Sequence, residues 1–256
     1  MLFQIRSYLN FLWKSSNEHG VHSPFVFDFV TKCLYDKEKY REYDFFKKYR
    51  KVLLSDENVI NVTDFGAGSR VFKSSKRKIA DIAATAGISS ERSQMLFRIT
   101  KYFQPQNILE IGTSLGLATA AFSSGNQSAE ITTIEGCPET AAAAKRTFEK
   151  FKLSNIKAAT GEFTEVLLGL QQSFDMIYFD GNHQKDATLQ YFNLLLPTAN
   201  NNSVWIFDDI HWSPGMESAW ETIKQNPLIT VTIDTFQWGI VFFRKEQEKE
   251  NFTIRV

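Results

Sequence analysis

Apolar side chains recur every three or four residues in three stretches near the start of the chain, at residues 2–13, 25–34 and 45–54. Pro24 follows Ser23 at the start of the second stretch, where a proline can open a helix. The pattern predicts three amphipathic helices.

From residue 89 onward, helical spacing alternates with short apolar runs. Strands are expected at "NILEI", "EITTIEG", "IKAATGE", "FDMIYFDG" and "SVWIFDD", with helices between them, for example at residues 92–103 and 138–152. This alternation predicts an α/β fold with a mostly parallel sheet covered on both faces. The last two runs, "LITVTIDTF" and "GIVFFRK", flank Gln237 and Trp238 and predict an antiparallel hairpin.

A change of pattern near Val62 divides the chain into two expected domains. Residues 1–85 are predicted to form a helical N-terminal cap, and residues 86–256 a single catalytic domain of ordinary size. The cap would close a substrate pocket or pair two subunits of a homodimer. The sequence does not choose between these two roles.

The charge balance argues against a nucleic-acid partner. Lys and Arg total 29 and Asp and Glu total 29, which gives a formal net charge of zero and no global field for nucleic acid or an acidic membrane. Cys33 and Cys137 lie far apart without metal-ligand spacing, and no leader or membrane-spanning apolar run is seen. We expect a cytoplasmic protein.

The stretch "ILEIGTSLGLAT" predicts a strand, a glycine turn and a helix. Gly112 and Gly116 remove side chains, so that backbone amides and the following helix N-terminus can face an anionic group. A dinucleotide fold would show G-x-G-x-x-G here, whereas this chain has Glu110 before G-x-x-x-G. Glu110 would repel a phosphate and favour a ligand that also carries an ammonium group.

Glu135 stands at the end of the second strand, where a carboxylate can accept hydrogen bonds from both ribose hydroxyls. A nucleoside with an amino-acid tail satisfies Glu110, the glycine turn and Glu135 together. The alternative is a turn that serves chain geometry alone.

The motifs "LEIGTSLG", "TTIEG", "TGEF" and "FDMIYFDGNH" resemble those of the class I S-adenosylmethionine (SAM)-dependent methyltransferases, and their layout is most similar to the small-molecule, catechol-type O-methyltransferases. The resemblance spans residues 89–244. It implies a Rossmann-like sheet of seven strands that ends in the antiparallel pair. The cofactor residues it implies are Glu110, Gly112, Thr113, Ser114 and Gly116 around the methionine part, Glu135 at the ribose, Glu162 and Phe163 at the adenine, and Asp180. Phe163 could equally be a core residue.

Three aspartates follow the fourth and fifth strands. In catechol-type enzymes an Asp and an Asp-Asn pair at these places hold a metal ion, and the resemblance therefore implies that Asp180, Asp208 and Asp209 bind Mg²⁺ or Ca²⁺. The Asn is replaced by Asp209 in this chain, which alters the charge of the site. The alternative is that these side chains cap helices or line the pocket.

Two histidines are candidates for the base that takes the proton from an acceptor hydroxyl. His183 lies three residues after Asp180 and is the first choice, and His211 follows Asp209 by two residues. Lys185 is one residue out of place for the catalytic lysine of catechol-type enzymes. Trp212 could wall the acceptor pocket.

The sequence therefore predicts an enzyme that transfers a methyl group from SAM to a hydroxyl of a small molecule, with possible magnesium assistance. Two alternatives stay open: an NAD-dependent oxidoreductase, which the absent G-x-G-x-x-G disfavours, and a non-catalytic SAM-binding module. Methylation of nucleic acid is disfavoured by the charge balance and by the lack of an Asn-Pro-Pro-Tyr or Asp-Pro-Pro-Tyr element.

A second glycine loop, "VTDFGAGSR", resembles the first but lacks a strand–helix–strand context. Its basic neighbours could meet an anionic substrate as part of a lid, or form a solvated loop. They are Arg70, Lys73, Lys76, Arg77 and Lys78. His19 and His22 could reach the site from the cap or pack within a turn.

Overall fold

The computed structural model describes residues 2–63 and 74–256. Its contacts group the chain into two compact units, the first made of Met1–Asp36 with Gln171–Val256 and the second of Lys37–Leu170. Of the eight strands of the main sheet, five belong to the first unit and three to the second.

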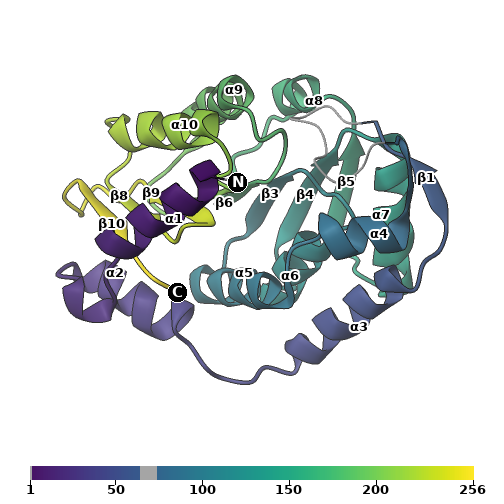
Figure 1. Cartoon of the computed structure of the whole chain (residues 1–256), viewed down its shortest axis with the longest axis horizontal. Helices are drawn as coiled ribbons and strands as arrows, with labels where there is room; N and C mark the ends of the chain where they lie inside the picture. The colour runs from purple at the N-terminus through teal and green to yellow at the C-terminus, as the bar shows by residue number, and fades with distance from the viewer. Residues whose placement is uncertain (1, 64–73) are drawn as a thin grey trace. The chain divides into compact units, whose positions relative to one another are not determined.

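The sheet of the second unit contains the strand–helix alternation predicted from residue 89. Its strands pair in parallel, in the order β3-β4-β5 (Figure 1). They are β3 (Asn107–Ile111), β4 (Glu130–Glu135) and β5 (Ile156–Thr160), and the helices are α5 (Ser90–Phe103), α6 (Leu117–Gly125), α7 (Pro138–Lys150) and α8 (Phe163–Gly169). Ile108, Leu109 and Ile111 are fully buried in β3 because the strand is covered on both faces.

The first unit holds the other five strands, in the order β10-β8-β9-β7-β6. They are β6 (Met176–Phe179), β7 (Val204–Asp208), β8 (Val231–Asp234), β9 (Trp238–Phe242) and β10 (Glu250–Thr253). The predicted hairpin is formed by β8 and β9, and β9 also pairs antiparallel with β7. Helices α9 (Lys185–Leu195) and α10 (Pro214–Gln225) lie side by side in this unit (Figure 1), and the short η3 (Leu196–Thr198) follows α9.

The predicted mostly parallel α/β sheet with an antiparallel hairpin is confirmed, with eight strands in place of seven. The extra strand is β10, which pairs in parallel with β8. Its residues "ENFT" include exposed polar side chains and only one buried apolar residue, Phe252, so that they show too little hydrophobic pattern to predict a strand.

Within residues 1–85 the three predicted helical stretches are present. The helical elements are α1 (Leu2–Lys14), η1 (Glu18–Gly20), α2 (Pro24–Phe29), η2 (Val30–Leu34), α3 (Glu42–Leu54) and α4 (Ile79–Thr85). As predicted, Pro24 opens a helix, and the Ser23 hydroxyl caps it by accepting a hydrogen bond from the Val26 N–H. The structure adds a short antiparallel pair, β1 (Val59–Asn61) with β2 (Lys76–Lys78), which the basic sequence of β2 did not predict.

Large aromatic side chains form the core of the first unit. Trp205, Trp220 and Trp238 are each at most 1% exposed. Phe179 and Phe207 stack between neighbouring strands with ring centroids 4.2 Å apart. No helix in the described part of the chain combines the length and the apolar character needed to cross a bilayer.

Gly239 in β9 is expected to tolerate no side chain. A methyl group at this position would lie 2.5 Å from the Trp220 ring, whereas one at Gly169, at the end of α8, would meet nothing within 4 Å. We predict that Gly239→Ala lowers the free energy of unfolding by about 1–3 kcal/mol through overpacking. Denaturant unfolding of Gly239→Ala and of the control Gly169→Ala checks this. An equal loss of stability in the two variants would contradict the prediction.

Candidate functional site

The turn between β3 and α6 is held by backbone hydrogen bonds to β4. The N–H groups of Gly112 and Thr113 both donate to the Ile134 carbonyl, at 2.9 and 3.1 Å. Gly112, Ser114 and Gly116 have φ values of 100°, 48° and 78°. These left-handed conformations explain the two glycines, and Ser114 adopts one at a cost that its neighbours must offset.

Gly116 is also required by packing. A methyl group there would lie 2.3 Å from the Phe148 ring and 2.8 Å from the Tyr49 hydroxyl. That hydroxyl donates a hydrogen bond of 3.0 Å to the Leu115 carbonyl, which ties α3 to the turn. The Phe148 ring and the Tyr49 hydroxyl therefore pack against one side of the turn. Packing alone explains why residue 116 is a glycine.

Glu110 at the end of β3 is fully buried. Its Oε2 atom accepts hydrogen bonds of 2.5 Å from the Thr119 and Thr133 hydroxyls. Burial raises the pKa of Glu110 to about 8 despite these hydrogen bonds, and the charge of Glu135 adds to the rise. Glu110 is therefore mostly protonated at neutral pH, which differs from the expectation that it presents a negative charge to an ammonium group.

Replacing Glu110 with Gln should remove a pH dependence of stability. The folded protein keeps the proton up to a pH of about 8, whereas the unfolded chain loses it above about 4.5, so that the free energy of unfolding falls as the pH rises between these values. We predict that Glu110→Gln gains on the order of 2–4 kcal/mol relative to the wild type between pH 5 and pH 8. Denaturant unfolding across this range measures the difference, and the exposed Glu149→Gln is the control. Parallel pH profiles of Glu110→Gln and the wild type would contradict the assignment.

Glu135 at the end of β4 joins two turns. Its Oε2 accepts a hydrogen bond of 2.8 Å from the Ser114 N–H, and its Oε1 one of 2.9 Å from the Cys137 N–H. The side chain is partly exposed, and a carboxylate has room for about four hydrogen bonds. Glu135 can therefore support the turn and still accept hydrogen bonds from a ligand.

Glu162 and Phe163 follow β5, as predicted. The Glu162 carboxylate caps α8 by accepting a hydrogen bond of 3.0 Å from the Glu165 N–H and one of 3.2 Å from the Thr164 hydroxyl. Desolvation opposes ionisation, but hydrogen bonds to Thr164 and Glu165 together lower the pKa of Glu162 below its usual value. Phe163 is 8% exposed, as a core residue would be.

Thr113, in the turn after β3, is also buried, and its hydroxyl shares a hydrogen bond with that of Thr133.

In the first unit, the loop after β6 carries Asp180 and His183. The His183 Nε2 atom lies 3.6 Å from Asp180 Oδ1, and the two side chains are 26% and 19% exposed. Lys185 donates a hydrogen bond of 2.8 Å to the Ser218 hydroxyl of α10. Asp180 and His183 therefore form a loose, partly accessible pair.

The loop after β7 carries Asp208 and Asp209, two of the three predicted metal ligands. Asp208 is 3% exposed, and its Oδ1 atom accepts a hydrogen bond of 2.9 Å from the N–H of Asp209, which has a left-handed φ of 52°. Among residues 2–63 and 74–256, no group of three His, Cys, Asp or Glu side chains could hold a metal ion. Metal binding by Asp180, Asp208 and Asp209 therefore stays a prediction of the family resemblance.

His211 is embedded among side chains that the sequence did not single out. Its Nε2 atom lies 2.9 Å from Asp234 Oδ2, and its ring stacks on Phe236 with centroids 5.2 Å apart. Its Nδ1 atom is buried, without a hydrogen-bond partner in the described part of the chain, and lies 3.8 Å from Glu217 Oε1. Phe236 itself has a left-handed φ of 73°, and its N–H donates to Asp234 Oδ1 at 2.7 Å.

Asp234 could have been found from the sequence. It ends the strand β8, and both β7 and β8 pair antiparallel with β9. Asp208 is opposite Trp238 and Asp234 is opposite Gly239, so that β7 and β8 end on either side of the start of β9. An acid at the end of this strand therefore follows the same pattern that identified Asp180 and Asp208. Glu217, in contrast, carries no signal beyond its place on a helix.

The other candidates lie as follows. His19 and His22 are exposed, and Trp212 is partly buried, with its carbonyl accepting a hydrogen bond of 3.4 Å from the Gln4 side chain. The N-terminal glycine loop, with Asp64, Gly66, Gly68, Arg70 and Lys73, lies outside the described residues. Lys76, Arg77 and Lys78 form β2.

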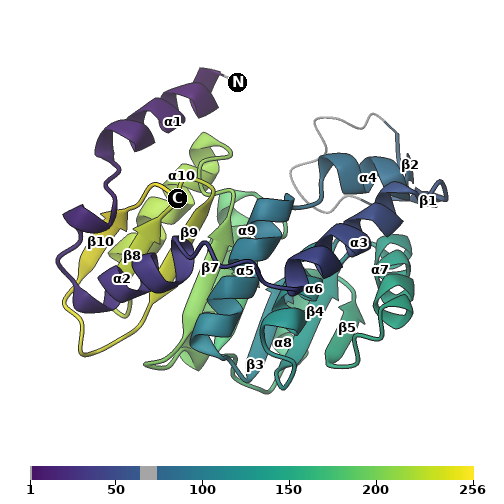
Figure 2. The same ribbon diagram turned by 90° about the horizontal axis from the view of Figure 1, so that it is seen from below.

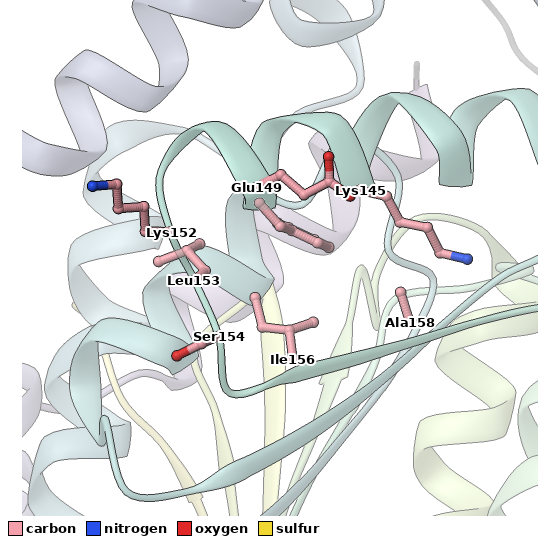
Figure 3. Close-up of a pocket in the computed structure, with 8 residues that line it drawn as sticks. Lys145, Glu149, Lys152, Leu153, Ser154, Ile156 and Ala158 are labelled. Atoms are coloured by element: carbon pink, nitrogen blue, oxygen red, sulfur yellow. The ribbon is translucent and has the colours of Figure 1, made fainter.

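A cavity of about 420 Å³ lies between the C-terminal half of α7 and β5 (Figure 3). Phe148, Leu153 and Ile156 provide apolar lining, and the Lys145 and Lys152 side chains extend in opposite directions at its two sides. None of the predicted site residues is among those that line it. The cavity is therefore separate from the candidate site.

The comparisons with known proteins agree with the sequence motifs. Residues 109–210 match the family model described as a methyltransferase domain. The O-methyltransferase hkm8 of Aspergillus hancockii is 27% identical over 132 residues, which are 49% of this chain and 52% of that protein. The chain thus spans about half the length of this relative.

Solved structures show the same fold. The SAH (S-adenosylhomocysteine)-bound methyltransferase PaMTH1 of Podospora anserina has a TM-score of 0.61 and 16% identity, covering 88% of this chain and 97% of its own. An O-methyltransferase from Bacillus cereus in complex with SAH has a TM-score of 0.56 and 18% identity, covering 85% and 96%. TomG of Streptomyces achromogenes, an O-methyltransferase in complex with SAM, has a TM-score of 0.54 and 17% identity, covering 61% and 81%.

These findings confirm the predicted resemblance to the class I SAM-dependent methyltransferases and the Rossmann-like fold class. Because the solved structures are only 16–18% identical to this chain in sequence, their similarity shows a shared fold and no more. The family match adds that the stretch similar to a methyltransferase domain, residues 109–210, includes the turn after β3 and the ends of β4, β6 and β7.

Proposed function

We propose that the protein is a SAM-dependent O-methyltransferase that acts on a hydroxyl group of a small molecule. The observation that carries this proposal is the partly exposed Glu135 carboxylate, hydrogen-bonded to the turn after β3 at the strand end where the family resemblance expects the ribose. The methyltransferase-domain match and the O-methyltransferase relative support the same reaction.

The residues of the turn would bind the methionine part of SAM through their backbone. Thr113 is buried and its hydroxyl is already hydrogen-bonded, while Gly112 and Gly116 have no side chain. These three residues can therefore bind a ligand only through their backbone groups. Ser114 adds a partly exposed side chain. Protonated Glu110 would act from behind the turn, by fixing Thr119 and Thr133.

The adenine would lie near Glu162 and Phe163, at the start of α8. The Glu162 side chain caps α8 and Phe163 is largely buried. We therefore propose that these two residues contribute to adenine binding indirectly, by fixing the conformation of the N-terminus of α8. A direct contact with Asp180 stays a prediction of the family resemblance.

Replacement of Glu135 with Ala should weaken cofactor binding by on the order of 1–3 kcal/mol, because charge-assisted hydrogen bonds to the ribose are lost. Isothermal titration with SAH measures the affinity. Glu130→Ala, at the opposite end of the same strand, is the matched control and should bind SAH like the wild type. Equal affinity of Glu135→Ala and Glu130→Ala would remove the ribose assignment.

Transfer of the methyl group requires a base for the acceptor proton. The acceptor oxygen forms a bond to the methyl carbon as the bond from that carbon to sulfur breaks, the proton passes to the base, and neutral SAH leaves. We propose His183 as this base and Asp180 as the group that orients it, since His183 is more accessible than His211, whose Nδ1 atom is buried. His211 would instead hold the loop after β7 through Asp234. No step is assigned to a metal ion.

His183→Asn should therefore lower kcat by roughly 100-fold or more and flatten the pH profile of kcat, as expected for loss of a general base. His211→Asn should mainly lower thermal stability, because it disrupts the contacts with Asp234 and Phe236. The assay is transfer of radiolabelled methyl from SAM to a panel of phenolic compounds, with the exposed His22→Asn as control. A flattened profile in His211→Asn and an unchanged one in His183→Asn would exchange the two roles.

The same measurements separate the alternatives. A non-catalytic module would bind SAH with the affinity of the wild type but would methylate no acceptor of the panel. An oxidoreductase would bind NAD in the titration in place of SAH.

A further inference from the structure

The N-terminal helix α1 has a small inner side that contacts the first unit. The Ser7 hydroxyl donates a hydrogen bond of 3.1 Å to Glu217, and the Gln4 side chain donates one of 3.4 Å to the Trp212 carbonyl. The Phe11 ring lies 5.4 Å from that of Phe236. Only Ser7 and Phe11 of the whole helix are buried.

The outer side of α1 carries most of its apolar surface. Leu2 is 86% exposed, Ile5 52%, Leu9 61% and Trp13 84%. At 100° per residue these four positions lie on one stripe, opposite Ser7 and Phe11. Figure 2 shows α1 at the periphery of the first unit. An ordinary surface helix faces its apolar stripe to the core, and α1 does the reverse.

The spacing of the stripe favours another helix as its partner. The exposed positions Leu2, Ile5, Leu9 and Trp13 are spaced by three, four and four residues, so that they form one stripe about 80° wide along the helix. This is a narrow seam rather than the broad face of a membrane-bound helix. Binding to anionic lipid typically uses a cluster of about four to eight basic residues, and α1 has only Arg6 and Lys14.

We propose that α1 pairs with α1 of a second copy of this chain, in an antiparallel arrangement about a two-fold axis. With its three aliphatic side chains and Trp13 between 52% and 86% exposed, the stripe offers on the order of 600 Å² per chain. Two copies would thus bury roughly 1,200 Å², the lower end of specific interfaces, so that we expect a weak, reversible homodimer.

Antiparallel pairing follows from the way α1 is anchored. Beyond its C-terminal end, Ser16 forms a bridge with Ile254, and Arg255 donates a hydrogen bond of 3.1 Å to the Leu12 carbonyl. Parallel pairing would bring these anchored ends of both copies together, whereas antiparallel pairing separates them. It also aligns Ile5 of one copy with Leu9 of the other and opposes the two helix dipoles.

The test is the oligomeric state, measured by sedimentation velocity between about 1 and 100 µM, the range in which an interface of this size should dissociate. The wild type should shift from monomer to dimer across the range. Leu9→Glu should stay monomeric, because it places a charge in the seam. The control is Asn10→Glu, which adds the same charge to the neighbouring exposed position and should dimerise like the wild type. At concentrations where the wild type is monomeric, both variants should keep its Tm, because both side chains point to solvent.

A double variant tests the direction of the pairing. Ile5→Lys combined with Leu9→Glu places opposite charges across an antiparallel pair and like charges across a parallel one, so that the double variant should dimerise better than Leu9→Glu alone. Failure to do so overturns the antiparallel arrangement. A wild type that stays monomeric, or equal behaviour of Leu9→Glu and Asn10→Glu, overturns the proposal. Binding of a monomeric wild type to phosphatidylserine vesicles would identify a membrane as the partner instead. None of these measurements needs cofactor or acceptor, and they are therefore independent of the proposed methyl transfer.

Discussion

The hydrogen bonds that Glu135 accepts from the Ser114 and Cys137 N–H groups hold together the candidate cofactor site. Parallel strands end at the same edge of a sheet, but their following turns are free to take different conformations. One carboxylate connects the turn after β3 to the turn after β4 and supports Ser114 in a left-handed conformation. The position of the turn, and of every backbone group in it, therefore depends on the side chain that is also proposed to bind the ribose.

Two glutamates at neighbouring strand ends have different environments. Glu110 is sealed behind Thr119 and Thr133, and burial together with the charge of Glu135 keeps it protonated at neutral pH. Glu135 is partly exposed and accepts backbone hydrogen bonds. An acid at the end of a strand is thus not by itself a ligand for a cation, because its burial decides whether it carries a charge.

In the first unit, α1 belongs both to the surroundings of His211 and to the proposed dimer interface. Its inner side contacts Glu217 and Phe236, which in turn lie against His211. Any force that holds α1 in place would therefore also order the loop after β7. This arrangement gives the N-terminal helix a part in the surroundings of His211 that its sequence, a simple amphipathic pattern, does not indicate.

The sequence by itself determined the alternation of strands and helices from β3 to β7, the terminal hairpin, the glycine turn and the places of the strand-end acids, because each depends on local periodicity and on backbone conformations that glycine allows. The tertiary structure decided the protonation of Glu110, the burial of Asp208, the pairing of His211 with Asp234 and the outward face of α1. These properties depend on which side chains meet and on how much water reaches them, and residues such as Asp234 and His211 meet only through the folded chain.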